Sequence, residues 1–306
     1  MSADAESDKM MYCASCGIAG DDDVKLKDCS ACKLVRYCSV NCQKEHRPQH
    51  KKEYNKRAAE LRDEILFKQP EVRYLGDCPI CCLPHPIDSM KSTLMSCCCK
   101  TICSGCAHAN TICEMEGNLQ QKCPFCRHPV PKSEDEIERN LMKRVEANDP
   151  VAISHMGGKR CGEGDYYGAF EYWTKAAELD DVGAHYQLSV VYREGLGVEK
   201  DEKREVYHLE EAAIGGHAGA RHNLACFEWE NGRHDRALQH WIVAAKLGDE
   251  NAVDTLKDAY RKGHVRKEDF ASALRAHQAA VNATKSPLRE KAAAAAAEGF
   301  RLNVPI

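Results

Sequence analysis

Cysteine is the residue type in this sequence with the most chemical potential. The chain has 19 cysteines, and all of them except Cys161 and Cys226 lie between Cys13 and Cys126. Most come as pairs separated by two residues, a spacing that lets a tight backbone turn present two sulfur atoms to one metal ion. Because Zn²⁺ takes four tetrahedral sulfur or nitrogen ligands, repeated pairs of this kind indicate zinc sites.

The choice between zinc and disulfide bonds depends on the redox compartment. The first residues, MSADAESDKM, lack the apolar segment of a secretory signal, and no stretch of the sequence is apolar enough for a membrane span. We therefore expect an intracellular protein, cytoplasmic and/or nuclear, without a membrane partner. Thiols stay reduced there, and C-x2-C pairs are then usually metal ligands.

The first cysteine series occupies residues 13–54, which contain few aliphatic side chains. Its members are Cys13, Cys16, Cys29, Cys32, Cys38, Cys42, His46 and His50. Such a segment cannot bury enough apolar surface to offset its chain entropy. Bound metal must supply the missing stability, on the order of 10 kcal/mol or more per site.

This first series resembles a MYND-type zinc finger in its runs CASC, CSAC, RYCSVNCQKEH and RPQH. The resemblance implies two interleaved zinc sites, which spacing alone does not distinguish from sequential ones. One site would consist of Cys13, Cys16, Cys38 and Cys42. The other would consist of Cys29, Cys32 and His50.

The chain departs from the family pattern at the last ligand position. That position usually holds a cysteine four residues after the histidine, and this chain has Tyr54 there. A phenol, with a pKa near 10, is a poor zinc ligand. His46 is a possible substitute, but we expect Pro48 to begin the helix that carries His50, which leaves His46 off its regular face. The second ion should therefore be bound weakly, or with water as a ligand.

The second cysteine series lies in residues 77–130 and resembles a RING finger of the eight-cysteine variety. Its members are Cys78 and Cys81, then Cys97, Cys98 and Cys99, then Cys103 and Cys106, and finally Cys123 and Cys126. The resemblance implies cross-braced sites, with Cys78, Cys81, Cys103 and Cys106 on one ion. Two central cysteines would join Cys123 and Cys126 on the other. A ligand five residues before Cys103 is common in such modules, which selects Cys98, and we take Cys97 over Cys99 as its partner.

The resemblance also implies a function. In RING-type ubiquitin ligases, an aliphatic residue in the first pair and a proline in the last contact the ubiquitin-conjugating enzyme, and Ile80 and Pro124 match them. A basic residue after the last cysteine holds the ubiquitin thioester in its reactive pose, and Arg127 stands there. Such ligases position two partners and need no covalent catalytic residue. The alternative is that Ile80 and Arg127 are ordinary surface residues, because a fold does not fix a function.

Four thiolates around one Zn²⁺ leave a site with a net charge of about −2, which nearby N–H groups and cations must offset. The basic side chains close to this series in the sequence are Lys100, Lys122, Arg127 and His128. We expect these side chains to offset the negative charge of the zinc sites.

The rest of the chain has a helical repeat pattern. Ser133 and Glu136 predict the start of a linker helix over residues 133–149. Each of four alanines is then followed, four positions later, by an apolar residue. These alanines are Ala152, Ala184, Ala220 and Ala252. With the segment endings KAAELDD, EAAIGGH and AAKLGDE, residues 150–284 resemble Sel-one-like repeats, relatives of the tetratricopeptide repeat. Such repeats are expected to bind a protein or peptide. Residues 285–306 are interpreted as a flexible tail.

Together these patterns predict a mainly α protein with two small cross-braced zinc modules followed by a solenoid of helical hairpins. Residues 1–12 are expected to be disordered, and residues 55–76 to form a helical linker. The favoured function is a RING-type ubiquitin ligase with up to four Zn²⁺ ions, a ubiquitin-conjugating enzyme as one partner and a substrate on the repeats. The alternative is a non-enzymatic adaptor or scaffold, for example in transcriptional regulation.

Nucleic acid is an unlikely partner on charge grounds. The formal net charge is −4, which is the wrong sign for a chain that coats a phosphate backbone. The basic segment 44–57 is the local exception, and a cluster of this kind is most often a solvated helix face.

Overall fold

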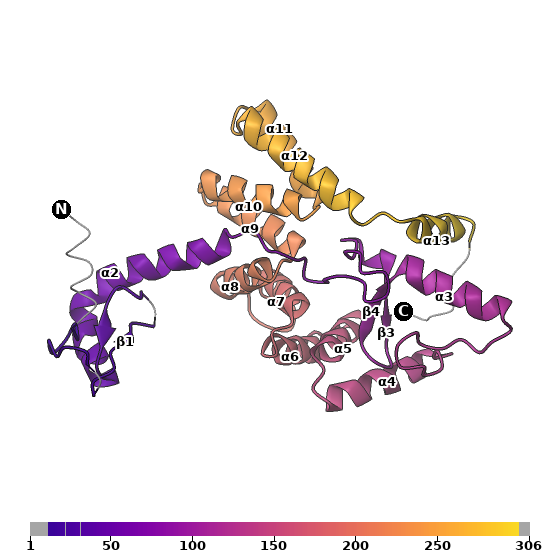
Figure 1. Cartoon of the computed structure of the whole chain (residues 1–306), viewed down its shortest axis with the longest axis horizontal. Coiled ribbons are helices and arrows are strands. Elements are labelled where there is room, and N and C mark those ends of the chain that lie inside the picture. The colour runs from indigo at the N-terminus through magenta and orange to yellow at the C-terminus, as the bar shows by residue number, and fades with distance from the viewer. Residues whose placement is uncertain (1–11, 22, 31, 300–306) are drawn as a thin grey trace. The chain divides into compact units, whose positions relative to one another are not determined.

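The structure is a computed structural model that describes residues 12–21, 23–30 and 32–299. It is mainly helical, as predicted (Figure 1). The chain divides into two compact units, Met1–Lys68 and Gln69–Ile306. The predicted disorder of residues 1–12 concerns a segment that, apart from Tyr12, lies outside the described residues.

Over its described residues, the first unit has a short hairpin and one long helix. Strands β1 (Lys27–Asp28) and β2 (Arg36–Tyr37) pair antiparallel, and helix α2 covers Val40–Leu66. The helix begins after Ser39, whose hydroxyl accepts a hydrogen bond from the N–H of Cys42 at 3.2 Å. The prediction that Pro48 begins this helix is wrong, because Pro48 lies inside it. The predicted linker over residues 55–76 starts as a continuation of the same helix.

The cysteine-rich part of the second unit is a hairpin followed by a helix. Strands β3 (Ser92–Met95) and β4 (Lys100–Cys103) pair antiparallel after the short 3-10 helix η1 (Ser89–Lys91), and α3 covers Ser104–Glu116. The register joins Met95 to Lys100 and Ser92 to Cys103. The hairpin turn therefore carries Cys97, Cys98 and Cys99, while β4 delivers Cys103 to the start of α3. Two distant cysteine pairs are thus positioned by a single supersecondary element.

The remaining helices form consecutive antiparallel hairpins. The linker helix α4 covers Glu134–Glu146, and the repeats follow as α5 (Pro150–Gly162), α6 (Tyr166–Ala177), α7 (Val182–Glu194), α8 (Glu202–Ile214), α9 (Ala218–Glu230), α10 (His234–Lys246), α11 (Glu250–Arg261) and α12 (Lys267–Asn282). The repeated alanines Ala152, Ala184, Ala220 and Ala252 are all fully buried. Small residues there let paired helices approach closely, which is why the pattern recurs.

The repeats also share a capping residue that the sequence analysis did not identify. The first helix of each hairpin has its N-cap three residues before the repeated alanine, and the cap side chain accepts a hydrogen bond from that alanine's N–H. The caps are Asp149, Asp181, His217 and Asp249. His217 alone uses a ring nitrogen, Nδ1, which lies 3.0 Å from the N of Ala220. Burial lowers the pKa of His217 to about 4, so this nitrogen stays free to accept.

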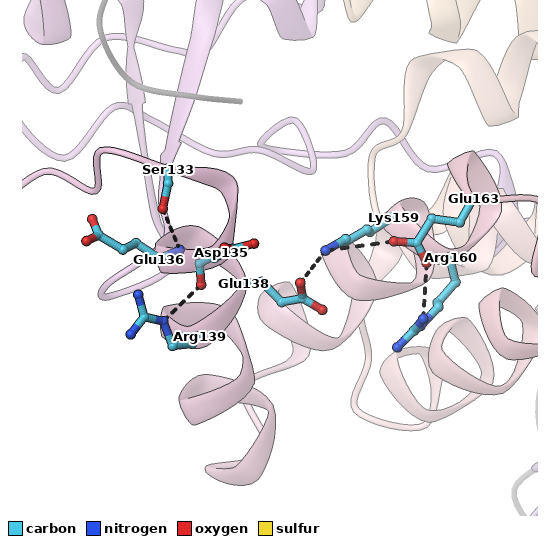
Figure 2. Close-up of polar contacts among 8 residues, drawn as sticks. All are labelled: Ser133, Asp135, Glu136, Glu138, Arg139, Lys159, Arg160 and Glu163. Atoms are coloured by element: carbon cyan, nitrogen blue, oxygen red, sulfur yellow. Dashed lines mark hydrogen bonds and ion pairs between the residues drawn. The ribbon is translucent and has the colours of Figure 1, made fainter.

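Helix α4 joins the cysteine-rich module to the first repeat. Ser133 caps it by accepting from the N–H of Glu136 at 3.3 Å, as the sequence predicted, and Glu138 reaches Lys159 of α5 at 2.5 Å (Figure 2). On its apolar face, Ile137 and Leu141 pack in one buried cluster with Cys99 of the β3–β4 turn. The module is therefore attached to the repeats through a hydrophobic core.

A second attachment is the extended segment before the first cysteine pair. The N–H of Tyr74 donates to the carbonyl of Gly216 at 3.4 Å, and its ring stacks on His217 with centroids 4.4 Å apart. The two Nη groups of Arg73 donate to the carbonyls of His85 and Ala280, at 2.9 Å and 2.8 Å. Part of the repeat surface is thus covered by the chain's own segment.

The third attachment is the C-terminal helix α13, which covers Pro287–Ala297 and packs against α3 (Figure 1). The interpretation of residues 285–306 as a flexible tail therefore differs from the structure over these residues. An alanine run carries no apolar stripe of its own, and Ala292 becomes buried only because α3 lies beside it. The last predicted tail residues, 300–306, lie outside the described range.

Within the described part of the chain, none of the helices combines the length and the apolar character needed to cross a bilayer.

Two adjacent glycines of α5 provide a test of the repeat packing. A Cβ on Gly157 would lie 2.6 Å from Nε1 of Trp173, whereas a Cβ on Gly158 meets nothing within 4 Å. Both changes to alanine favour the helix by about 1 kcal/mol, but overpacking at Gly157 costs about 1–3 kcal/mol. We expect Gly158→Ala to raise the urea midpoint and Gly157→Ala to lower it, measured by tryptophan fluorescence. Equal midpoints for the two variants would contradict this packing.

Candidate metal centres

Four C-x2-C pairs fold into the same tight turn. In each, the residue after the second cysteine donates its N–H to the carbonyl of the first cysteine, over 2.8 to 3.0 Å. The donating residues are Gly17, Lys33, Cys82 and Arg127, and all four have a positive φ, between 53° and 75°. This left-handed residue reverses the chain, so that both sulfur atoms of the pair point to the same side. Cys82 and Arg127 thus have a backbone role independent of their side chains.

The turns, the β3–β4 hairpin and two helices bring twelve sulfur atoms into three groups. Within each group all the sulfurs lie within 4.8 Å of one another. The groups are Cys13, Cys16, Cys38 and Cys42, then Cys78, Cys81, Cys103 and Cys106, and finally Cys97, Cys98, Cys123 and Cys126. These are three of the four sets that the sequence analysis expected. That they bind zinc stays a prediction.

The distances inside the groups fit a tetrahedral zinc ion. With Zn–S bonds near 2.3 Å, two sulfurs of one tetrahedron are about 3.8 Å apart. The Cys81–Cys103 and Cys98–Cys123 sulfurs are 3.8 and 3.7 Å apart, and Cys38 lies 3.6 Å from both Cys16 and Cys42. The Cys97–Cys126 distance is shorter, 3.3 Å. The donor set, four thiols at these separations, is compatible with zinc binding.

The protein environment favours one thiolate in each of the first two groups. Burial alone would raise the pKa of Cys78, but N–H groups of Cys103, Cys81 and Ile80 point at its sulfur and lower that pKa to about 7. The pKa of Cys13 falls to about 6, again against burial and through backbone N–H groups. Further ionisation is opposed, because burial and neighbouring sulfurs raise the pKa of Cys106. A divalent cation removes that opposition.

The fourth expected set, Cys29, Cys32 and His50, is less closely gathered. All three are buried, and Nε2 of His50 lies 3.1 Å from the sulfur of Cys32. Among the described residues, however, their three ligand atoms do not fall within 4.8 Å of one another, unlike those of the other sets. The Cys29 turn has the same backbone geometry as the other pairs. The turn that carries Cys29 and Cys32 is therefore formed as in the other sets, whereas the three ligand atoms are less closely gathered.

The surroundings of His50 explain which groups are available as a fourth ligand. Tyr54 packs against the buried cysteine cluster, with its ring edge-on to His50 at a centroid distance of 6.3 Å. His46 lies one turn before His50 on α2, and the two rings stack at 5.5 Å. Nδ1 of His46 is 3.1 Å from the hydroxyl of Tyr37. His46 is therefore on the same helical face as His50, contrary to the expectation based on Pro48.

The cysteines outside these sets have other surroundings. Cys99 is buried against Ile137 and Leu141 of α4, which is consistent with the choice of Cys97 over Cys99. Cys82 and Cys113 are exposed.

The predicted conjugating-enzyme contacts lie on the two turns of the second module. The side chain of Ile80 is 42% exposed, Arg127 is exposed and Pro124 is half-buried. Phe125, which the sequence analysis did not single out, is also exposed beside Pro124. The two turns therefore present apolar atoms and one cation to solvent.

The expected counter-charges differ from those observed. Lys100, Lys122, Arg127 and His128 are all exposed. A guanidinium that reaches the group Cys78, Cys81, Cys103 and Cys106 is that of Arg289 on α13, whose Nη2 donates to the sulfur of Cys81 at 3.5 Å. No local sequence signal points to it, because it lies 208 residues along the chain from Cys81.

Residues 6–53 match the family model of the MYND finger, and no RING family model matches the chain. No curated protein matches the chain. Among solved structures, a Sel1 repeat protein from Oxalobacter formigenes is similar with 24% identity and a TM-score of 0.43, over 65% of this chain and 79% of that one. The protective antigen c5321 of uropathogenic Escherichia coli, which has an SLR fold, gives 21% identity and a TM-score of 0.39, over 56% and 37%. Because both TM-scores are below 0.5, the assignment of helical repeats rests on the helical hairpins of this structure and not on these similarities.

The Tyr54 position gives a test of the fourth set. We expect Tyr54→Cys to add a fourth soft ligand and so to retain one more zinc ion per chain than the wild type after dialysis against a mild chelator. Zinc would be counted by mass spectrometry, with Tyr54→Phe as the matched control that should behave as the wild type. Adding His50→Ala to Tyr54→Cys should abolish the gain. Equal zinc content in Tyr54→Cys and wild type would contradict the assignment.

Proposed function

We propose that this protein is a zinc-dependent ubiquitin ligase of the RING type, with a MYND finger and helical repeats that select its substrates. The observation that carries the proposal is the cross-braced grouping of eight sulfurs in the second module. The first and third cysteine pairs meet, and the second and fourth meet. Zinc would supply structure there, by fixing the two turns relative to each other.

The surface of these two turns supports a conjugating-enzyme site. Ile80 on the first turn and Phe125 on the second are exposed, and Pro124 is half-buried, so both turns offer apolar atoms to a partner. The backbone N–H of Arg127 donates to the carbonyl of Cys123 at 3.0 Å, which places this exposed residue at the end of the second turn. A cation next to an exposed apolar turn suits a ligase that orients a thioester without attacking it.

The repeats supply a substrate site in this proposal. The second helices of the first two hairpins carry exposed aromatic side chains, with Tyr167 on α6 60% exposed and Tyr207 on α8 52% exposed. Exposed tyrosines are frequent anchors in protein interfaces because they bury a large area at a low entropy cost. The substrate is accordingly expected to be a protein or peptide. The region around His217 is already covered by Tyr74.

The test is autoubiquitination of the zinc-loaded chain with a panel of conjugating enzymes. We expect Ile80→Ala to reduce the rate about tenfold, which corresponds to about 1.4 kcal/mol of lost contact. Arg127→Gly keeps the positive φ of 59° while removing the cation, and should reduce the rate by a similar factor. Arg127→Lys, which keeps the charge, is the matched control and should retain most of the activity. Absence of activity in the wild type with every enzyme would overturn the ligase proposal.

A second candidate is a non-enzymatic scaffold in which the cysteine-rich module holds the repeats in place. The observation that favours it is the burial of Cys99 in one core with Ile137, Leu141 and Met156. The scaffold hypothesis expects partner capture by a chain that transfers no ubiquitin, with capture lost when zinc is removed. The same assay, run beside a pull-down with and without chelator, separates the two candidates.

A further inference from the structure

Arg289 makes a set of contacts that links the C-terminal helix to one cysteine group. Its Nη1 donates to the carbonyls of Pro84 and Thr284, both at 2.7 Å. Its Nη2 donates to the carbonyl of Leu83 at 3.2 Å and faces the sulfur of Cys81 at 3.5 Å. All these partners except Thr284 belong to the first C-x2-C turn of the second module or to the chain that leaves it. The guanidinium is therefore fixed from several directions against this turn.

The side chain is 8% exposed, which is unusual for an arginine. Burying a cation without a nearby negative charge is costly, and three carbonyl acceptors supply only partial charges. Four thiolates around one Zn²⁺ would supply a net charge of about −2 beside it. The cysteine group with zinc bound thus accounts for the burial, and the arginine in turn offsets the excess charge of the group.

The backbone is adapted to bring this arginine close. A Cβ on Gly105 of α3 would lie 2.7 Å from the backbone N of Arg289, so the two helices touch at a position where only glycine fits. Ser286 caps α13 by accepting from the N–H of Arg289 at 3.3 Å, and Pro287 follows as its first residue. Gly105 stands next to Cys106, one of the four cysteines. The contact between α13 and α3 is therefore also what brings the Arg289 guanidinium to the cysteine group.

We propose that Arg289 is the built-in counter-cation of the zinc site formed by Cys78, Cys81, Cys103 and Cys106, and that docking of α13 controls how long this ion stays bound. The inference rests on the zinc site of the proposed function. Arg289 acts as a positioning residue, because it touches a ligand sulfur and the chain around it. Loss of the helix or of the charge should destabilise this ion and leave the ions held by the other cysteine sets unaffected.

The experiment measures zinc release from the full-length, zinc-loaded chain to the chromophoric chelator pyridylazoresorcinol. Arg289→Met keeps the length of the side chain and removes its charge, and should release one ion per chain about tenfold faster, as expected for loss of an outer contact to a metal ligand. Arg289→Lys retains the cation and should stay within about threefold of the wild type. Arg275→Met, at an exposed arginine of α12, is the matched control and should not differ from the wild type.

A second variant keeps the inference testable if Arg289→Met does not fold. Gly105→Ala retains Arg289 and every cysteine but pushes α13 away, and should also release one ion faster. Unchanged release in Arg289→Met or in Gly105→Ala would overturn the inference, as would equal rates for Arg289→Lys and Arg289→Met, which would indicate packing without a role for charge. The zinc content of the wild type reports separately on the proposed function, since a metal-free second module would remove that proposal itself.

Discussion

The left-handed residue that follows four of the C-x2-C pairs is the constraint on which the cysteine-rich parts of this protein depend. It turns the chain back after the second cysteine and gives both sulfurs a common direction. Four such turns, with a hairpin and two helices, gather sulfurs that lie up to 29 residues apart in the chain. Over the residues that the structure describes, neither the first module nor the second has an apolar core large enough to hold its turns together without the sulfur groups. The segments that pack against these turns are therefore positioned relative to the sulfur groups.

Much of this arrangement is encoded locally and was predictable. Four of the C-x2-C pairs form the same local turn, and the periodic alanines at Ala152, Ala184, Ala220 and Ala252 specify where paired helices must approach. Both signals act within a few residues or repeat along the chain, so composition and spacing reveal them. The choice of Cys98 came instead from the resemblance to RING modules, and Cys97 was taken over Cys99 as its partner. The physical reason for this second choice became visible only with α4, which buries Cys99 in a different core.

The features that the sequence did not reveal depend on distant partners. Pro48 was expected to begin a helix, but it lies inside α2 between Cys42, which packs against the buried cysteine cluster, and His50, whose Nε2 is 3.1 Å from the sulfur of Cys32. That packing offsets the backbone hydrogen bond that a proline cannot donate. The alanine run of α13 forms no apolar stripe, so the sequence of this helix alone does not reveal that it packs against α3. Arg289 has no neighbour in sequence that marks it as a partner of Cys81.

The histidine that caps α9 has a consequence for the exchangeability of the repeats. At this point the other three hairpins have an aspartate, whose charge needs hydration or donors around it. His217 instead stacks with Tyr74 and Tyr186, at centroid distances of 4.4 and 4.2 Å, and remains neutral while it accepts from Ala220. A carboxylate placed between the rings of Tyr74 and Tyr186 would lose its hydration. The third hairpin is therefore specialised for its place, and shuffling or duplicating hairpins within this array would break the junction that fastens the cysteine-rich module to it.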